Sequence, residues 1–293
     1  MTIKYAVNRI LNKEYINTST FYSHVLPYRI IKAIYPSHKI DTVRIYDGKH
    51  SLQLDPTDAL NLAWYRIYEP FETQTMLNSI DEGDTVLDLG AFIGYYSVQF
   101  SYKVGPKGSV YSVEASPNNF DILKENTRKY DNIHIENRAV AKEHNSTVSI
   151  YECNSNNGMN RIYPSKYSSS KTSNQKVKTM RLDSYFAGRQ PINFIKMDLE
   201  GSEFGALEGM EEIFQNNKGV KLMMEFHPDS IKEYGKNPRD LIELLYSYGL
   251  KPYHLNKKTK QKEIIKLTIT STGSNIDDFV EYSNNETTNL ICE

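Results

Sequence analysis

Short apolar runs alternate with segments of helical spacing through most of the chain after residue 84. Apolar runs of about four to eight residues that are bounded by turn-forming residues are typical of strands. The segments between them carry apolar side chains three and four positions apart, which indicates helices. This alternation favours an α/β fold with a parallel sheet. The predicted strands cover 85–89, 109–114, 133–137, 147–151, 176–182, 194–197 and 220–228, and a long helix is predicted over 229–248.

The two ends of the chain follow other patterns. Before residue 76 we expect helical segments at 3–11, 21–33 and 58–68, a hairpin at 41–54 that turns at Asp47-Gly48, and a helix that ends near residue 80. After the last predicted helix, 251–272 resembles a closing hairpin, and the residues beyond it are mostly polar. The predicted organisation is therefore an N-terminal α+β addition (1–75), an α/β domain (76–273) and a polar C-terminal tail (274–293).

The first predicted strand leads into a glycine-containing loop and then a helix. Asp88, Gly90 and Gly94 give the spacing D-x-G-x-x-x-G, with Ala91 where a dinucleotide-binding loop would carry a second glycine. Glycine lets the backbone and a ligand approach each other closely. The spacing favours a cofactor without a pyrophosphate, and the alternative is an ordinary tight strand-to-helix turn.

A second candidate lies at the end of the next strand. Glu114 follows Gly94 by 20 residues, about where such folds place an acid against ribose hydroxyls. A carboxylate can accept hydrogen bonds from both hydroxyls of a vicinal diol. The alternative is an acid at a helix N-terminus, but Ser116 and Pro117 already supply the expected cap.

Acids also follow the two later strands. Asp198 and Glu200 end one strand, and Glu225 and His227 end the next. The carboxyl ends of parallel strands face one crevice, so these side chains are expected to meet there. For Glu200 the alternative is a charged helix start, shared with Lys196 and Glu203.

Composition narrows the classes of function. The 293 residues are 39% hydrophobic and 24% charged, with a net charge of −1 and a pI of about 6.7, so there is no basic bias towards nucleic acid. No stretch approaches the length of a membrane helix, and the two cysteines form neither a metal motif nor a disulfide framework. We expect a cytoplasmic protein with a small-molecule partner, no nucleic-acid partner and no membrane. The oligomeric state has no signal in the sequence.

Five stretches, taken in order, resemble the FkbM family of S-adenosylmethionine-dependent methyltransferases. They are 88–97, 113–117, 137–140, 195–203 and 224–228, and the resemblance covers roughly residues 68–255. It implies a class I methyltransferase (Rossmann-like) fold, with a seven-stranded mostly parallel sheet and a reversed final strand. It also implies O-methylation of a hydroxyl on a sugar or other small metabolite.

The resemblance carries roles onto particular residues. Gly90, Ala91 and Gly94 are expected at the amino-acid part of S-adenosylmethionine and Glu114 at its ribose. The full cofactor-binding set is predicted as Asp88, Gly90, Ala91, Gly94, Glu114, Ala115, Ala139, Val140 and Asp198. Ala139 and Val140 are expected beside the adenine, although they could simply be packed.

His227 is the first choice for general base, because its ordinary pKa lies near neutral pH. Asp198 and Glu225 complete the predicted catalytic set. The alternative role for His227 is a satisfied histidine at a helix start beside Pro228. In a further alternative, Asp198, Glu200, Glu225 and His227 together hold a divalent metal such as Mg²⁺. No residue is assigned as a metal ligand.

Two other functional classes stay open. One is an NAD-dependent oxidoreductase, against which the glycine spacing counts. The other is a non-catalytic binding or scaffold protein that keeps the fold. The polar excursion at 154–175 could close on a substrate or have no role. With the N-terminal addition, it is expected to shape the substrate pocket.

Overall fold

The computed structural model of the chain describes residues 41–45, 48–169, 175–256, 261–265, 269–270, 273–274, 279–280, 283 and 288–293. The predicted helical segments at 3–11 and 21–33 lie outside these residues. In the described part, no helix is both long enough and apolar enough to cross a membrane.

The main sheet has the predicted topology. Its strands lie in the order β5-β4-β3-β9-β10-β15-β11-β12, and β5, β4, β3, β9 and β10 pair in parallel. β15 is antiparallel to both β10 and β11, which confirms the reversed final strand. β12 pairs with β11 and adds an eighth strand at the edge. The bounds are β3 Thr85–Leu89, β4 Ser109–Glu114, β5 Ile133–Asn137, β9 Phe194–Met197, β10 Lys221–Phe226, β11 Pro252–Asn256, β12 Gln261–Ile264 and β15 Thr288–Cys292.

The central strands are apolar on both faces because both faces of the sheet are covered. All five residues of β3 are buried. Val86 packs into one apolar cluster with Phe100, and Leu87 and Leu89 pack into the other with Met197. A strand buried on both sides is largely apolar instead of alternating strictly, and Val86, Leu87 and Leu89 are the apolar residues that predict this strand from the sequence.

The helices between the strands begin near the predicted positions, but two are shorter than expected. The predicted helix at 229–248 is wrong as a single element, because it is divided into α11 and α12. Gly235 adopts a left-handed backbone with φ 88° after α11, and Asn237 then caps α12 ahead of Pro238. The spacing of Phe204, Leu207 and Met210 predicts a helix that includes all three residues, but this helix likewise ends early, at Leu207. The bounds are α6 Tyr95–Val104, α7 Pro117–Thr127, α8 Leu182–Phe186, α9 Glu203–Leu207, α10 Glu211–Asn216, α11 Pro228–Glu233 and α12 Pro238–Ser247.

The described part of the N-terminal region begins with the two strands of the predicted hairpin, β1 (Thr42–Ile45) and β2 (His50–Gln53). Of the predicted turn, Asp47 lies outside the described residues. The predicted helix at 58–68 is wrong, because only the single turn α4 (Leu62–Tyr65) forms before α5 (Pro70–Asn78). Asp58 and Asn61 adopt left-handed backbones, with φ of 47° and 54°, which interrupt the helix. Val43, Ile45 and Leu52 join the same apolar cluster as Val86, so the hairpin shares the core of the main sheet.

The C-terminal residues correct the expectation of a polar tail. Thr288–Cys292 form β15, which lies between β10 and β11. Leu290, Ile291 and Cys292 are completely buried. The last residues of the chain therefore belong to the centre of the fold.

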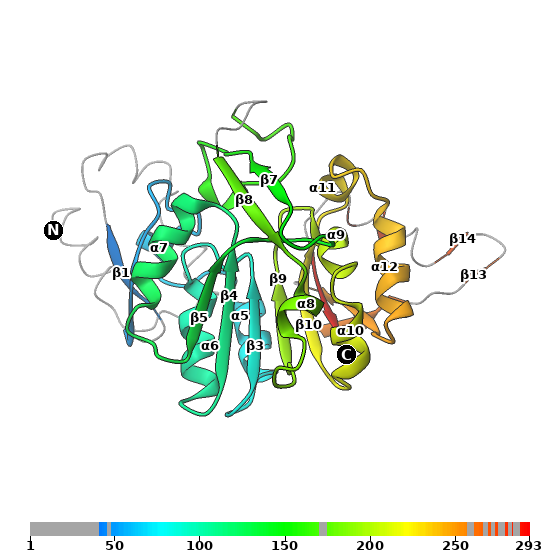
Figure 1. Cartoon of the computed structure of the whole chain (residues 1–293), viewed down its shortest axis with the longest axis horizontal. Coiled ribbons are helices and arrows are strands. Elements are labelled where there is room, and N and C mark those ends of the chain that lie inside the picture. Colours follow the sequence, from blue (N-terminus) through cyan, green and yellow to red (C-terminus); the bar gives the residue numbers. More distant parts are fainter. Residues whose placement is uncertain are drawn as a thin grey trace, which may run out of the picture.

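A smaller sheet lies above the main one at the top of Figure 1. β8 (Gln175–Met180) pairs in parallel with β6 (Ala139–Val140) and antiparallel with β7 (Thr147–Ile150). The predicted strands at 147–151 and 176–182 therefore form, but they lie outside the main sheet. The polar excursion leaves from β7 and includes the short 3-10 helix η1 (Asn157–Met159). Two further two-residue strands, β13 (Ile269–Thr270) and β14 (Gly273–Ser274), pair with each other.

Candidate active site

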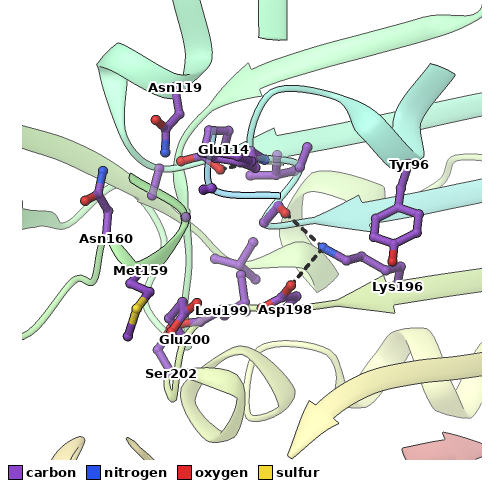
Figure 2. A pocket seen from close by; sticks show the side chains of 18 of the residues that line it. Tyr96, Glu114, Asn119, Met159, Asn160, Lys196, Asp198, Leu199, Glu200 and Ser202 are labelled. Atoms are coloured by element: carbon purple, nitrogen blue, oxygen red, sulfur yellow. Dashed lines mark hydrogen bonds and ion pairs between the residues drawn. The ribbon is translucent and has the colours of Figure 1, made fainter. Parts of the chain in front are cut away.

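A pocket lies at the carboxyl ends of β3, β4 and β9, where the topology predicts a ligand site. It also receives residues from the N-terminal region and from the polar excursion. Met159 and Asn160 of the excursion are labelled in Figure 2. Its lining includes Ala59, Leu60, Tyr68, Gly90, Ala91, Phe92, Tyr95, Tyr96, Glu114, Ala115, Asn119, Arg138, Ala139, Val140, Asn156, Gly158, Met159, Asn160, Ile162, Lys196, Asp198, Leu199, Glu200 and Ser202.

The two glycines of the loop, Gly90 and Gly94, have different structural roles. Gly90 lines the pocket at φ 75°, and a Cβ there would lie 1.8 Å from the backbone oxygen of Asp198. The close neighbour that requires glycine is thus the adjacent strand end. Gly94, at φ 88°, caps α6 outside the pocket lining, and a Cβ there would lie 2.9 Å from Leu123 of α7. Gly94 therefore serves helix packing.

Glu114 is positioned by backbone amides on both of its carboxylate oxygens. Oε2 accepts from the N–H of Phe92 at 2.9 Å, and Oε1 accepts from the N–H of Ser116 at 2.8 Å. Burial raises the pKa of Glu114, and these two amides oppose that shift. Ser116 caps α7, as predicted. Glu114 is 7% exposed and faces the pocket from the end of β4.

The predicted adenine wall also borders the pocket. Ala139 and Val140 form β6 and are almost completely buried, at 2% and 3% exposure. Ala115 lines the pocket from the turn after β4. The two interpretations of Ala139 and Val140 are compatible, because the residues are packed and also line the site.

Asp88 lies behind the pocket. It is fully buried and outside the lining, it accepts a hydrogen bond from Ser97 Oγ at 2.6 Å, and its Oδ1 lies 3.7 Å from Lys196 Nζ. Burial raises the pKa of Asp88, and the nearby ammonium of Lys196 opposes that shift. Asp88 therefore anchors Lys196 in the structure.

Lys196 is the centre of this ion-pair network. Its ammonium donates to the backbone oxygen of Gly90 at 2.9 Å and lies 3.5 Å from Asp198 Oδ2, as Figure 2 shows. Burial lowers the pKa of Lys196, but the charges of Asp198 and Asp88 outweigh it and raise the pKa overall. The interpretation of Lys196 as part of a charged helix start is wrong, because the side chain is buried. The position of this lysine inside an otherwise apolar strand was the sequence feature that indicated its burial.

Three acids converge beside the glycine loop. Asp198, Glu200 and Glu225 each offer a carboxylate oxygen, and these oxygens lie within 4.8 Å of one another. Burial, together with the charge of Asp198, raises the pKa of Glu200 to about 8, although Arg161 pairs with it at 3.0 Å. Burial and the same neighbouring carboxylates raise the pKa of Glu225. Such a cluster can hold a proton or a cation, and its oxygen donors suit a hard divalent metal.

His227 caps α11, which is the alternative that the sequence left open. Its Nδ1 accepts the backbone N–H of Ser230 at 3.2 Å. Burial lowers its pKa, and the positive charge of Arg161 adds to that effect. His227 does not line the pocket, so its role as general base stays a prediction.

Sequence reasoning did not single out several lining residues. Tyr68 lines the pocket from the N-terminal region, and Asn156, Met159 and Asn160 line it from the excursion. Only the expectation that these two segments shape the pocket pointed to them. Asn119 could not be singled out from the sequence, because the adjacent Asn118 has the same local sequence context and yet is exposed.

Comparison with known proteins agrees with this geometry. The family described as Methyltransferase FkbM domain matches residues 88–252, more than half of the chain. The chain belongs to the FkbM methyltransferase family. Its fold is that of the class I S-adenosylmethionine-dependent methyltransferases, as the strand order indicates. No curated protein matches the chain.

Solved structures of methyltransferases resemble this FkbM-family chain at low identity. A SAM-dependent methyltransferase from Aquifex aeolicus is 16% identical over 82% of this chain and 98% of its own, with a TM-score of 0.41. A SAM-dependent O-methyltransferase from Thermotoga maritima is 12% identical over 89% and 80%, with a TM-score of 0.41. Methyltransferase FkbM from Methylobacillus flagellatus KT is 17% identical over 65% and 46%, with a TM-score of 0.38.

Proposed function

We propose that the chain transfers a methyl group from S-adenosylmethionine to a hydroxyl of a sugar or other small metabolite. The observation that carries the proposal is the position of the acid cluster. Asp198 and Glu200 line the same pocket as the glycine loop and Glu114, so a cofactor-binding surface and proton-accepting groups face one cavity. Family membership supports the methyltransferase chemistry.

The pocket fits such a cofactor in its donor and acceptor groups. Gly90 and Ala91 present backbone to the ligand without bulky side chains, Glu114 presents a carboxylate to hydroxyls, and Ala139 and Val140 offer an apolar wall. When bound, S-adenosylmethionine supplies an electrophilic methyl group.

The protein's own task is then to orient the acceptor oxygen and to take its proton. We assign the proton to the cluster of Asp198, Glu200 and Glu225. A carboxyl group whose pKa lies near 8, as for Glu200, is suited to general base catalysis near neutral pH. Tyr68 and Tyr96 line the same cavity and limit the access of water. His227 is the weaker candidate, because its Nδ1 is engaged in the helix cap.

The metal, the partners and the location of the protein remain predictions. The three carboxylates could bind a divalent ion such as Mg²⁺, but Arg161 already neutralises one of them. We keep the expectation of a small-molecule acceptor, with no nucleic-acid or membrane partner, in the cytoplasm.

Calorimetric titration with S-adenosylhomocysteine, with NAD as the control ligand, tests the cofactor. Micromolar binding of the former alone supports the proposal, and binding of NAD alone refutes it. Methyl transfer is then measured on a panel of hydroxylated sugars and metabolites, with Mg²⁺ and with EDTA. Cofactor binding without transfer to any acceptor in the panel would favour the scaffold alternative.

A further inference from the structure

Asn119 is a buried side chain of the pocket that the proposed mechanism does not use. It lies in the first turn of α7 and is 2% exposed. Its Nδ2 donates to the backbone oxygen of Asn157 at 3.1 Å, whereas its Oδ1 is buried and has no hydrogen-bond partner. A buried acceptor without a partner is destabilising, because it has lost its hydrogen bonds to water. The site therefore favours a ligand that brings a donor to Oδ1.

The orientation of the amide is fixed by its neighbour. Exchanging the nitrogen and oxygen of Asn119 would place Oδ1 against the carbonyl oxygen of Asn157, and two acceptors cannot form a hydrogen bond. The free group is therefore an acceptor and not a donor. Asn157 is itself held by the hydroxyl of Thr57, which accepts its backbone N–H at 3.2 Å.

Part of the accepting capacity of Glu114, next to Asn119 in Figure 2, is already occupied. A carboxylate has about four lone-pair sites. Backbone amides of Phe92 and Ser116 occupy two of them, one on each oxygen, and the neighbouring side-chain amide of Asn119 opposes the rise in the pKa that burial causes. About one site remains on each oxygen, so a second acceptor beside Glu114 would let the two hydroxyls of a vicinal diol be bound by separate groups.

We propose that Asn119 is a second ribose-binding residue, whose Oδ1 accepts a hydrogen bond from the ribose hydroxyl that Glu114 does not take. The inference rests on the proposed function, since the diol is that of S-adenosylmethionine. In this arrangement, the carboxylate of Glu114 and the amide of Asn119 each accept a hydrogen bond from one hydroxyl. It also ties the excursion to the cofactor, because Asn157 orients the amide and Asn160 Nδ2 donates to Ser116 Oγ at 3.3 Å.

The test combines protein variants with ligand analogues, in the manner of a double-mutant cycle. S-adenosylhomocysteine and its 2′-deoxy and 3′-deoxy analogues are titrated calorimetrically into the wild type, Asn119→Ala and Asn119→Leu. In the wild type, each missing hydroxyl should weaken binding roughly tenfold, the usual effect of one hydrogen bond. In Asn119→Ala, one of the two analogues should bind no more weakly than S-adenosylhomocysteine itself. Asn119→Leu has a similar shape without a hydrogen-bonding group and should lose its sensitivity to the same deletion.

Asn118→Ala is the matched control, since Asn118 lies on the same turn but is exposed and bonds Glu152. It should behave as the wild type does. If Asn119→Ala weakens all three ligands and keeps both tenfold losses, Asn119 has only a structural role and the inference is overturned. Should Asn119→Ala not fold, the inference is overturned if Asn119→Leu keeps both tenfold losses. Failure of the wild type to bind S-adenosylhomocysteine would instead refute the proposed function.

Discussion

Replacing Gly90 with alanine should separate two reasons for a glycine, namely backbone conformation and close approach. At φ 75°, an alanine incurs the left-handed penalty of about 1–2 kcal/mol. Its Cβ would also lie 1.8 Å from the oxygen of Asp198 and would have to move by about 1.2 Å to reach even the 3.0 Å limit of real contacts. Both atoms belong to well-bonded backbone, because Asp198 N–H donates to Leu89 at 3.0 Å and Gly90 N–H donates to Val113 at 2.9 Å.

Moving the two strand ends apart would weaken these hydrogen bonds and the one from Lys196, each worth about 1 kcal/mol. We therefore expect Gly90→Ala to lower the free energy of unfolding by about 3–5 kcal/mol. Gly219→Ala is the matched control, since Gly219 has φ 87° and a Cβ added there would meet no atom within 4 Å. It should lose only the left-handed penalty of about 1–2 kcal/mol.

Guanidinium chloride unfolding, followed by far-UV circular dichroism, measures both variants. The reasoning is refuted if the two variants lose the same stability. It is also refuted if Gly90→Ala retains wild-type affinity for S-adenosylhomocysteine, because the displaced loop carries Phe92, whose N–H orients Glu114.

Three further predictions concern the charged groups around the pocket. Lys196→Met should lower the free energy of unfolding by about 3–5 kcal/mol, because it leaves Asp88 buried without its cation. Adding Asp88→Asn should restore part of this loss in denaturant titrations. A double variant that recovers no stability would contradict the ion pair. Burial raises the pKa of Glu203 from 4.5 to about 7, so the folded state keeps a proton that the unfolded state has released between these values, and stability falls as the pH rises through that window. Glu203→Gln should remove up to about 3 kcal/mol of that fall, measured as unfolding free energy against pH, and an unchanged pH dependence would contradict the shift. His227→Asn keeps a side chain that can cap the helix, so this variant should keep its methyl-transfer activity. Asp198→Asn should lose most of that activity. The reverse result in single-turnover assays would return the role of base to His227.

The sequence predicted those parts of the fold and site that depend on local signals. Gly90 and Glu114 stand at the ends of strands that are largely apolar, so their place in the crevice follows from the parallel sheet alone. The acids after β9 and β10 were placed together by the same rule. The class of the fold needed only the order of strands and helices.

What the sequence did not reveal depends on contacts between distant segments. β15 has three apolar residues among polar ones, and its position is set by pairing with β10 and β11 rather than by its own pattern. The helix predicted over 58–68 had suitable spacing, but Asp58 instead uses its carboxylate to accept the backbone N–H of Leu62 at 2.8 Å. His227 satisfied the signals for both a base and a cap, and only the hydrogen bond to Ser230 distinguishes them.

The position of β15 also bears on how the chain acquires its fold during synthesis. β10 and β11 are made well before residues 288–292, yet the two do not pair with each other, because β15 lies between them. Until that strand emerges from the ribosome, β10 presents an unpaired apolar edge of the kind that promotes aggregation. Completion of the sheet therefore has to wait for residues 288–292, and a nascent chain halted before residue 288 would be a natural client for a chaperone.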